Sequence, residues 1–198
     1  MSIVSSSHKH TLRMVQIALF AALVAVMQVL STVIPMPYVK ITLTLIPVVL
    51  GGVYFGKKAA AILGGVFGLV VTLFTISGFD GGAYMMFTAK PIMTVFICFA
   101  KGILSGFISA CVFEALQKCQ KVGKALSITF AAGIAPIVNT AFFCTFLFLF
   151  YPQILSEWAA GTNVLVYMIT VLVGINFVVE FILNIILCPV IGTKINLK

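Results

Sequence analysis

Residues 56–76, GKKAAAILGGVFGLVVTLFTI, pass from a glycine and two lysines into a continuous apolar run. An α-helix rises about 1.5 Å per residue, so about 20 apolar residues cross the hydrocarbon core of a bilayer. Within the run, Gly64 and Gly68 lie four residues apart, and small residues at that spacing let two membrane helices approach closely. The stretch therefore predicts a tight turn followed by a membrane-spanning helix that packs through its glycines.

The composition of the whole chain excludes a water-soluble protein. Of its 198 residues, 62% are hydrophobic and only 8% are charged, and the mean hydropathy is +1.24. A soluble domain carries about 25% charged residues. The net charge of +8 would suit a nucleic-acid partner, but the basic residues lie between apolar runs and not in a patch with exposed aromatic residues. We therefore expect one integral membrane domain over residues 1–198, in contact with the lipid bilayer and without nucleic acid.

The apolar runs predict an all-α membrane protein, a bundle of six transmembrane helices. Residues 77–90, SGFDGGAYMMFTAK, are too rich in glycine and polar side chains for a helix in lipid. Residues 152–163, PQILSEWAAGTN, are also expected to form a loop. The six expected helices cover about residues 12–31, 41–55, 59–76, 91–116, 125–151 and 164–191.

Basic residues set the expected orientation, because cytoplasmic loops carry an excess of lysine and arginine. With the N-terminus in the cytoplasm, nine basic residues lie on the inner side, and two, Lys40 and Lys90, lie on the outer side. The nine inner residues are Lys9, Arg13, Lys57, Lys58, Lys118, Lys121, Lys124, Lys194 and Lys198. This asymmetry predicts that the N- and C-termini are both cytoplasmic. Lys101 belongs to neither group, since it lies inside the fourth helix.

Polar side chains occur at middle depth on three of the predicted helices. Lys101 lies on the fourth helix, Asn139 near the middle of the fifth, and Asn176 and Glu180 on one face of the sixth. A charged side chain is costly in a bilayer, so it marks either a pairing or a functional site. One interpretation is a structural network in which Lys101 is the likeliest partner of Glu180. The other is a polar pocket for a solute from outside, under long, glycine-rich outer loops that act as a lid.

The sequence contains no recognisable constellation for catalysis or for metal binding. Both histidines, His8 and His10, lie in the N-terminal tail, and only four acidic residues are present. Residues 51–57 match G-x-x-x-x-G-K, but Lys58 follows where a phosphate-binding loop has the serine or threonine that binds magnesium. We therefore expect no enzyme activity, no metal site and no cofactor in this chain. Uphill transport of a solute would then need energy from a partner or an ion.

The first three predicted helices carry a family resemblance. The stretch KITLTLIPVVLGGVYFGKKAAAILGGVFGLVV (40–71) and the A-x-x-x-A pair of Ala18 and Ala22 are similar to a substrate-binding S component of an energy-coupling factor (ECF) vitamin transporter. The resemblance implies a multi-pass protein of a prokaryotic plasma membrane that binds a vitamin with high affinity. It also implies that Ala18, Ala22 and Ala25 dock onto a transmembrane coupling subunit, which two ATPase subunits drive with ATP. The vitamin would lie in the outer half among helices four to six, capped by residues 35–40.

Within that family, KITLTLIPVVLGG (40–52) and APIVNT (135–140) are most similar to pantothenate-type members, although Lys57 stands where many relatives have proline. Pantothenate carries one carboxylate with hydroxyl and amide groups, which suits a buried cation with asparagine and threonine partners. The candidate substrate-binding residues are Tyr38, Lys40, Tyr84, Lys101, Asn139, Thr140, Asn176 and Glu180. Riboflavin, folate, pyridoxine or a thiamine precursor are alternative vitamins.

Two other classes of function stay open on the residues alone. A free-standing ion-coupled carrier of small solutes would use Glu180 as a proton or sodium site. Such carriers often show internal repeats, and none is found between the two halves of this chain. An intramembrane enzyme would need the catalytic constellation that is missing. A solute-binding subunit of a larger transporter is therefore the leading hypothesis.

Overall fold

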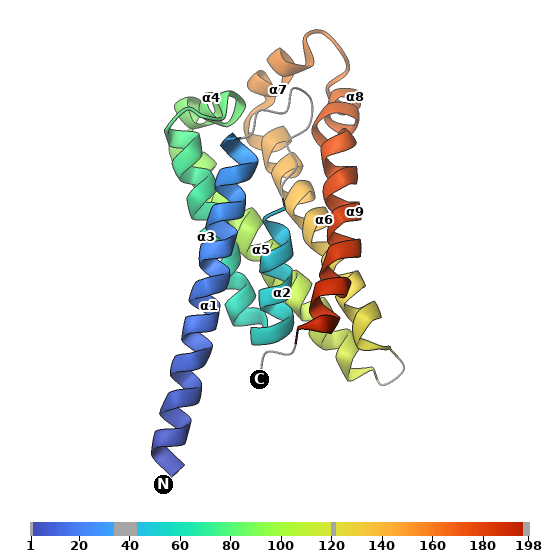
Figure 1. The fold of residues 1–198 in the computed structure, drawn as a ribbon. Helices are drawn as coiled ribbons and strands as arrows, with labels where there is room; N and C mark the ends of the chain where they lie inside the picture. Colours follow the sequence, from blue (N-terminus) through green and yellow to red (C-terminus); the bar gives the residue numbers. More distant parts are fainter. Residues whose placement is uncertain (1, 34–42, 120–121, 196–198) are drawn as a thin grey trace.

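The computed structural model of the chain describes residues 2–33, 43–119 and 122–195, and every regular element within these ranges is a helix (Figure 1). The elements are α1 (Ser2–Val33), α2 (Leu45–Phe55), α3 (Lys57–Ile76), α4 (Gly81–Ala89), α5 (Pro91–Lys118), α6 (Lys124–Phe150), α7 (Pro152–Ala159), α8 (Val164–Tyr167), the π-helix η1 (Met168–Val173) and α9 (Gly174–Lys194). Five spans in these ranges are long and apolar enough to cross a membrane, and α2 is a shorter apolar helix. The predicted all-α membrane bundle is confirmed.

Two outer segments that were expected to be loops form short helices instead. At the start of α4 the Asp80 carboxylate accepts a hydrogen bond from the Ala83 backbone N–H at 3.3 Å, which caps the helix N-terminus. α7 begins with Pro152, whose fixed φ angle suits the first turn of a helix, and buries Ile154 and Leu155. The glycine and polar content of these segments favoured loops, but their capping residues and buried side chains decide the local structure.

The first, second and sixth predicted helices differ most from the observed ones. α1 begins at Ser2 and not at about residue 12, so the predicted N-terminal tail with His8 and His10 is helical. α2 begins at Leu45, and residues 41 and 42 lie outside the described ranges. The sixth helix consists of α8, the π-helical segment η1 and α9. π-Helical turns often occur near functional sites. This interruption lies directly before Asn176 and Glu180.

The backbones of α3 and α5 touch along a row of glycines that we call the glycine seam: Gly64, Gly68, Gly102 and Gly106. A Cβ atom added to Gly64 would collide with the Gly102 carbonyl group. One added to Gly68 would lie only 2.6 Å from the Cys98 carbonyl oxygen. Because no larger side chain fits between the two backbones, the glycine spacing is confirmed as a signal of close helix packing.

Gly56 has a different role from the packing role that its spacing to Gly52 predicts. Its φ angle of +83° lies in the region that favours glycine, and it forms the turn between α2 and α3. A Cβ atom there would meet only the Glu114 carboxylate, at 3.6 Å. Gly52, in contrast, packs against Ala60 and Ala110. The expected tight inner turn is therefore present, and Gly56 closes it.

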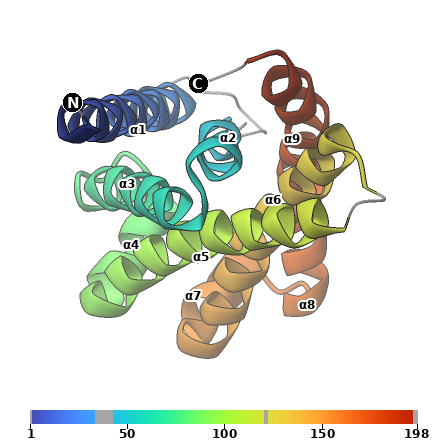
Figure 2. The ribbon, with the colours of Figure 1, turned by 90° about the horizontal axis from the view of Figure 1, so that it is seen from below.

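α5 crosses between α3 and α6 and contacts both helices (Figure 2). On the α6 side, the Ser105 hydroxyl donates to the Ala135 carbonyl at 2.7 Å, and the Ser109 hydroxyl donates to the Ala131 carbonyl at 2.8 Å. Such hydrogen bonds stabilise helix pairs in membranes. With the glycine seam on its other side, α5 is fixed in both depth and rotation. α1 then packs against α2 and α3, and α9 packs against α6.

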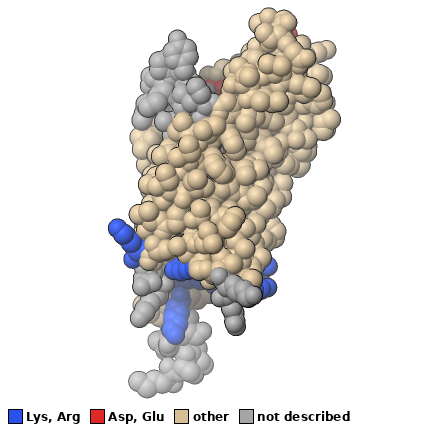
Figure 3. All heavy atoms as spheres, turned by 90° about the vertical axis from the view of Figure 1, so that its right-hand side faces the viewer, with Lys and Arg blue, Asp and Glu red and all other residues tan. Residues whose placement is uncertain are grey.

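Basic side chains gather at one end of the bundle (Figure 3). The α2–α3 turn, the start of α6 and the end of α9 bring Lys57, Lys124 and Lys194 to this end, where α1 also begins (Figure 1). The positive-inside rule assigns this end to the cytoplasm, in agreement with the predicted orientation. We call it the inner end. The opposite, outer end carries α4 and α7.

Gly64→Ala is expected to destabilise the bundle, because its Cβ atom would collide with the α5 backbone, which cannot move aside as a side chain can. Overpacking a core costs about 1–3 kcal/mol, so the midpoint of thermal unfolding in detergent should fall clearly. Gly65→Ala is the matched control, since its Cβ atom would meet only the Ile103 side chain, at 3.7 Å. Equal unfolding midpoints for the two variants would contradict the glycine seam.

Candidate functional site

The register between α5 and α6 brings two predicted polar residues to one level. The hydrogen bond from Ser105 to the Ala135 carbonyl fixes how far the two antiparallel helices are offset. Continued outward by about one helical turn, the same register places Lys101 opposite Asn139. The two residues were predicted at similar depth from sequence positions alone, and the packing of the helices agrees.

The register between α6 and α9 extends this level to a third helix. A Cβ atom added to Gly133 would lie 3.2 Å from the Phe181 side chain and 3.4 Å from the Ile185 side chain. Continuing this antiparallel register outward puts Asn139 level with residues 175–179. Three helices thus bring four polar side chains to within about one helical turn of the same depth, and we call this set the polar belt: Lys101, Asn139, Asn176 and Glu180.

Three members of the polar belt carry buried oxygen atoms that have no hydrogen-bond partner among the described residues. These atoms are Asn139 Oδ1, Asn176 Oδ1 and Glu180 Oε1. The described residues contain one other such side-chain atom, Thr75 Oγ1. A buried polar atom without a partner costs about 1–3 kcal/mol, and folded proteins pair nearly all of them. The polar belt therefore holds three buried acceptor atoms that no donor of the described residues reaches.

Lys101 is not in direct contact with Glu180, which corrects the pairing expected from the sequence. Among the described residues, no carboxylate oxygen lies within 4.0 Å of the Lys101 ammonium group. Lys101 Nζ instead lies 5.7 Å from the ring centre of Phe67 and 5.2 Å from that of Phe143. Aromatic faces attract a cation, and these two rings, on α3 and α6, hold the ammonium group between them.

Lys101 also lines a largely enclosed cavity of about 270 Å³, which we call the outer cavity. Phe143 and Trp158 provide aromatic walls, and Asp80 and Thr94 provide polar ones. The Thr94 hydroxyl is already hydrogen-bonded to the Tyr151 hydroxyl at 2.7 Å, and Asp80 caps α4. Lys101 therefore brings positive charge to a cavity whose other polar groups have partners within the protein.

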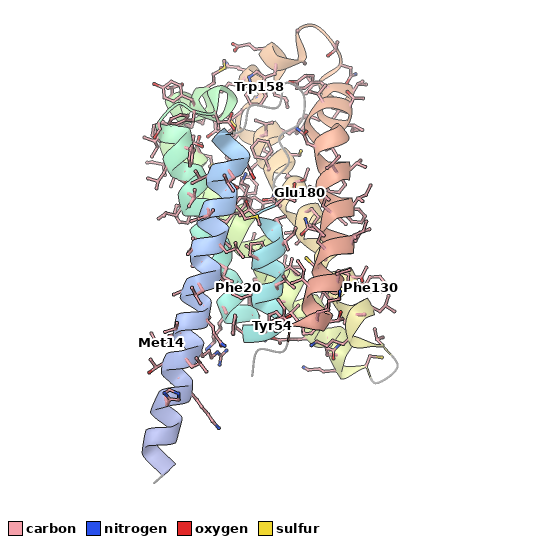
Figure 4. All side chains as sticks on the ribbon, viewed as in Figure 1. Met14, Phe20, Tyr54, Phe130, Trp158 and Glu180 are labelled. Atoms are coloured by element: carbon pink, nitrogen blue, oxygen red, sulfur yellow. The ribbon has the colours of Figure 1, made fainter. Side chains whose placement is uncertain are left out.

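The outer side of this cavity is closed by α4 and α7. Trp158, the single tryptophan of the chain, reaches from α7 to α4, where a Cβ atom added to Gly82 would lie 3.2 Å from the indole Cζ2 atom. Figure 4 shows Trp158 near the outer end and Glu180 deeper in the bundle. Trp158 and the ring residues Phe67 and Phe143 were not predicted as site residues. Aromatic residues in apolar segments carry no local signal of the cavity that they will face.

Of the predicted substrate-binding residues that the structure describes, Lys101 alone lines the outer cavity, and Tyr84 and Thr140 lie outside both this cavity and the polar belt. Tyr84 is 43% exposed on α4, so its ring is directed away from the core. Thr140 faces a separate hollow of about 190 Å³ between α6 and the η1–α9 helix. It lies about 100° around the helix from Asn139 and so points to another side. Tyr38 and Lys40, with the predicted cap over residues 35–40, lie outside the described ranges.

α1 presents the predicted alanine stripe at the surface of the bundle. Val24 is fully buried, and Phe20 packs against the same core, which also includes residues of α2 and α3. On another side of α1, Ala18 and Ala22 are exposed and Ala25 is half-buried. Only 11% of the membrane-spanning window of α1 is buried inside the chain. A wide apolar face of this helix is therefore left for lipid or for a partner.

One known protein family matches nearly the whole length of the helical bundle. A family model described as "ECF transporter, substrate-specific component" matches residues 12–192, from α1 to α9. A search of curated proteins finds no significant match. Components of this kind are multi-pass membrane subunits of a transporter and not enzymes, and they pair with an ECF module of transmembrane and ATPase subunits. The chain belongs to this family and is a substrate-specific component of an ECF transporter.

Proposed function

We propose that this substrate-specific component binds pantothenate from the outer side of the membrane and delivers it to its ECF module. The observation that carries the proposal is the polar belt, with three unpaired buried oxygen atoms and a lysine that has no carboxylate partner among the described residues. Of the four belt residues, Lys101 also lines the enclosed outer cavity. A membrane protein gains nothing in stability from such unpaired groups, so a ligand is the simplest reason for them.

The chemistry of pantothenate complements the belt. Its carboxylate would bind Lys101 as a charge-assisted contact. Its hydroxyl and amide N–H groups are donors, which the unpaired oxygens of Asn139, Asn176 and Glu180 require. Its methyl groups would contact the apolar walls of the outer cavity. The carboxylate, the donor groups and the methyl groups of pantothenate would therefore each contact protein groups of complementary chemistry.

The size of the outer cavity favours a small vitamin. Ligand pockets commonly measure about 300–1,000 Å³, and this one measures about 270 Å³. Riboflavin and folate contain extended fused rings and need more room. Pyridoxine is the second candidate, because Trp158 and Phe143 line the same cavity and would stack on a flat ring. Mass spectrometry of the small molecule that copurifies with the chain distinguishes the two.

Energy for uptake comes, in this proposal, from the partners. The substrate-specific component would carry no cofactor, and ATP would be hydrolysed by two ATPase subunits joined to a transmembrane coupling subunit. Docking is assigned to Ala18, Ala22 and Ala25. The exposure of Ala18 and Ala22 on α1 supports this assignment, since a face already packed inside the chain would be unavailable. Small side chains also permit close approach of another helix.

Lys101→Met is expected to weaken pantothenate binding by at least about tenfold, the effect of losing about 1.4 kcal/mol. Glu180→Gln keeps the shape of the side chain and removes its charge. We expect a comparable loss, because the carboxylate oxygen without a partner is assigned to a ligand hydroxyl. A milder effect would mean that Glu180 only orients Lys101. Isothermal titration calorimetry of each purified variant measures the affinity.

Thr75→Val is the control for both belt variants. It removes the other unpaired buried oxygen of the described residues, and Thr75 is outside the polar belt. Pantothenate affinity should be unchanged in this variant. If Lys101→Met and Glu180→Gln bind like the parent and only unfold at lower temperature, the belt is a structural network and the proposed site is misplaced.

Gly82→Ala is expected to slow solute entry and release, because the added methyl group would occupy the space beside the Trp158 indole. The closest contact of the added methyl group is the edge of one indole ring, at 3.2 Å, so the unfolding midpoint should change little. Stopped-flow measurement of the fluorescence of the single tryptophan reports both rates. Gly81→Ala is the matched control, since its Cβ atom would have nothing within 4 Å. Identical kinetics in the two variants would rule out a moving cover at this contact.

Ala18→Trp and Ala22→Trp are expected to abolish transport while solute binding stays near the parent value. A large ring on the small-residue face would prevent another helix from approaching closely. Leu23→Trp is the control, because Leu23 is 43% exposed but lies on a different side of α1. Uptake by reconstituted vesicles and binding by the isolated chain are measured in parallel. Full transport by both alanine variants would refute the docking assignment.

A further inference from the structure

α1 is held to the rest of the described chain by few side chains. In its outer half, the Thr44 hydroxyl of the residue before α2 donates to Gln28 Oε1 at 2.9 Å. In its inner half, Arg13 Nη2 donates to the Phe55 carbonyl oxygen at 2.6 Å. Between them, the Phe20 ring meets the Phe55 ring edge-on, with centroids 5.5 Å apart. These contacts, a second ring contact from Phe20 to Tyr54 at 6.4 Å and the fully buried Val24 attach a helix that is otherwise mostly exposed.

The carbonyl that Arg13 contacts is a strong acceptor. Phe55 is the last residue of α2, and the final carbonyl groups of a helix lack donors within that helix. They also carry the negative end of the helix dipole, which favours a cation. The guanidinium group therefore satisfies an acceptor and a partial charge together, in a charge-assisted hydrogen bond. This contact is more specific than an ordinary exposed arginine contact.

The turn that follows Phe55 is itself fixed to other parts of the bundle. Glu114 of α5 accepts a hydrogen bond from the Lys57 backbone N–H at 3.3 Å and lies 3.6 Å from the Lys57 ammonium group. The Tyr54 hydroxyl donates to the Ile195 carbonyl at 3.1 Å, just after the end of α9. Figure 4 shows Tyr54 and Phe20 in the inner half of the molecule. Arg13 therefore connects α1 to a point that α5 and the C-terminal part of the chain hold in place.

The two polar contacts determine which side of α1 faces outward. Successive helical residues are about 100° apart, so Arg13 and Gln28 lie about 60° apart around the helix. Ala18 and Ala22 fall on another side, and both are exposed. Turning α1 by one residue position would break the Arg13–Phe55 contact and direct the alanines elsewhere. The hydrogen bond from Arg13 to the Phe55 carbonyl and the exposure of Ala18 and Ala22 therefore require the same rotation of α1.

We propose that Arg13 is a positioning residue for docking: its hydrogen bond to the Phe55 carbonyl sets the rotation and depth of α1, so that the Ala18–Ala22 face meets the transmembrane coupling subunit. The inference rests on the proposed docking role of that face. Charge alone does not explain the role of Arg13, because Lys9, one turn earlier, makes no such contact with the described residues.

The test compares four variants of the full-length chain, each co-expressed with the ECF module of the same organism. Arg13→Met is expected to lower the amount of module recovered with the chain by about fivefold or more, the lower end of usual coupling between sites. Arg13→Lys keeps a donor and a charge and should retain most of the complex. Lys9→Met removes one positive charge without removing the contact, and it should behave like the parent. The thermal unfolding midpoint of each isolated variant is measured alongside.

Ala18→Trp, the fourth variant, separates this inference from the proposed function. If Ala18→Trp abolishes the complex and Arg13→Met forms it as well as Lys9→Met does, the positioning role of Arg13 is overturned and the docking face stands. If Ala18→Trp also forms the complex normally, the docking face itself is wrong. If Arg13→Met loses the complex only with a matching fall in its unfolding midpoint, Arg13 contributes to general stability, which likewise overturns the proposal. Loss of complex at an unchanged midpoint supports it.

Discussion

The contact between the α3 and α5 backbones is the constraint on which the rest of the bundle depends. At Gly64 and Gly102 the helices approach until neither can carry a side chain. In a membrane, where lipid is as apolar as a leucine side chain, such packing replaces the hydrophobic effect as the force between helices. Lys101 directly precedes Gly102 in the sequence. The contact between the two helices therefore also fixes the position of the Lys101 backbone. The Phe67 ring of α3 is held beside Lys101 for the same reason.

The polar belt follows from this scaffold through helix register. Serine hydroxyls of α5 bond to carbonyls of α6, and α6 packs closely on α9, so one level of the bundle collects Lys101, Asn139, Asn176 and Glu180. A network built only for stability would satisfy these groups internally. The observed belt leaves oxygens unpaired and holds the lysine between two aromatic rings. In the proposed function, these groups would offer both charge and acceptors to a solute.

The two ends of the bundle are built differently. At the inner end, the short α2–α3 turn contacts α1 through Arg13, α5 through Glu114 and the C-terminal segment through Tyr54. At the outer end, the short helices α4 and α7 approach each other at Trp158 and Gly82. The inner turn is thus joined to its neighbours through polar contacts, whereas the outer helices also share a buried apolar cluster that includes Met86, Ile154 and Leu155.

The amino-acid sequence alone determined the membrane environment, the helical class, the orientation and the glycine packing, because these depend on local composition, charge and spacing. It also placed Lys101, Asn139, Asn176 and Glu180 at similar depth, since helical rise converts residue number into distance. Only the tertiary structure decided that Lys101 lies between Phe67 and Phe143 and not against Glu180, and that Thr140 faces another hollow. It likewise revealed Trp158 in the cavity wall and the contact between Arg13 and the Phe55 carbonyl. These facts depend on helix rotation and on residues distant in the chain, which no local pattern encodes.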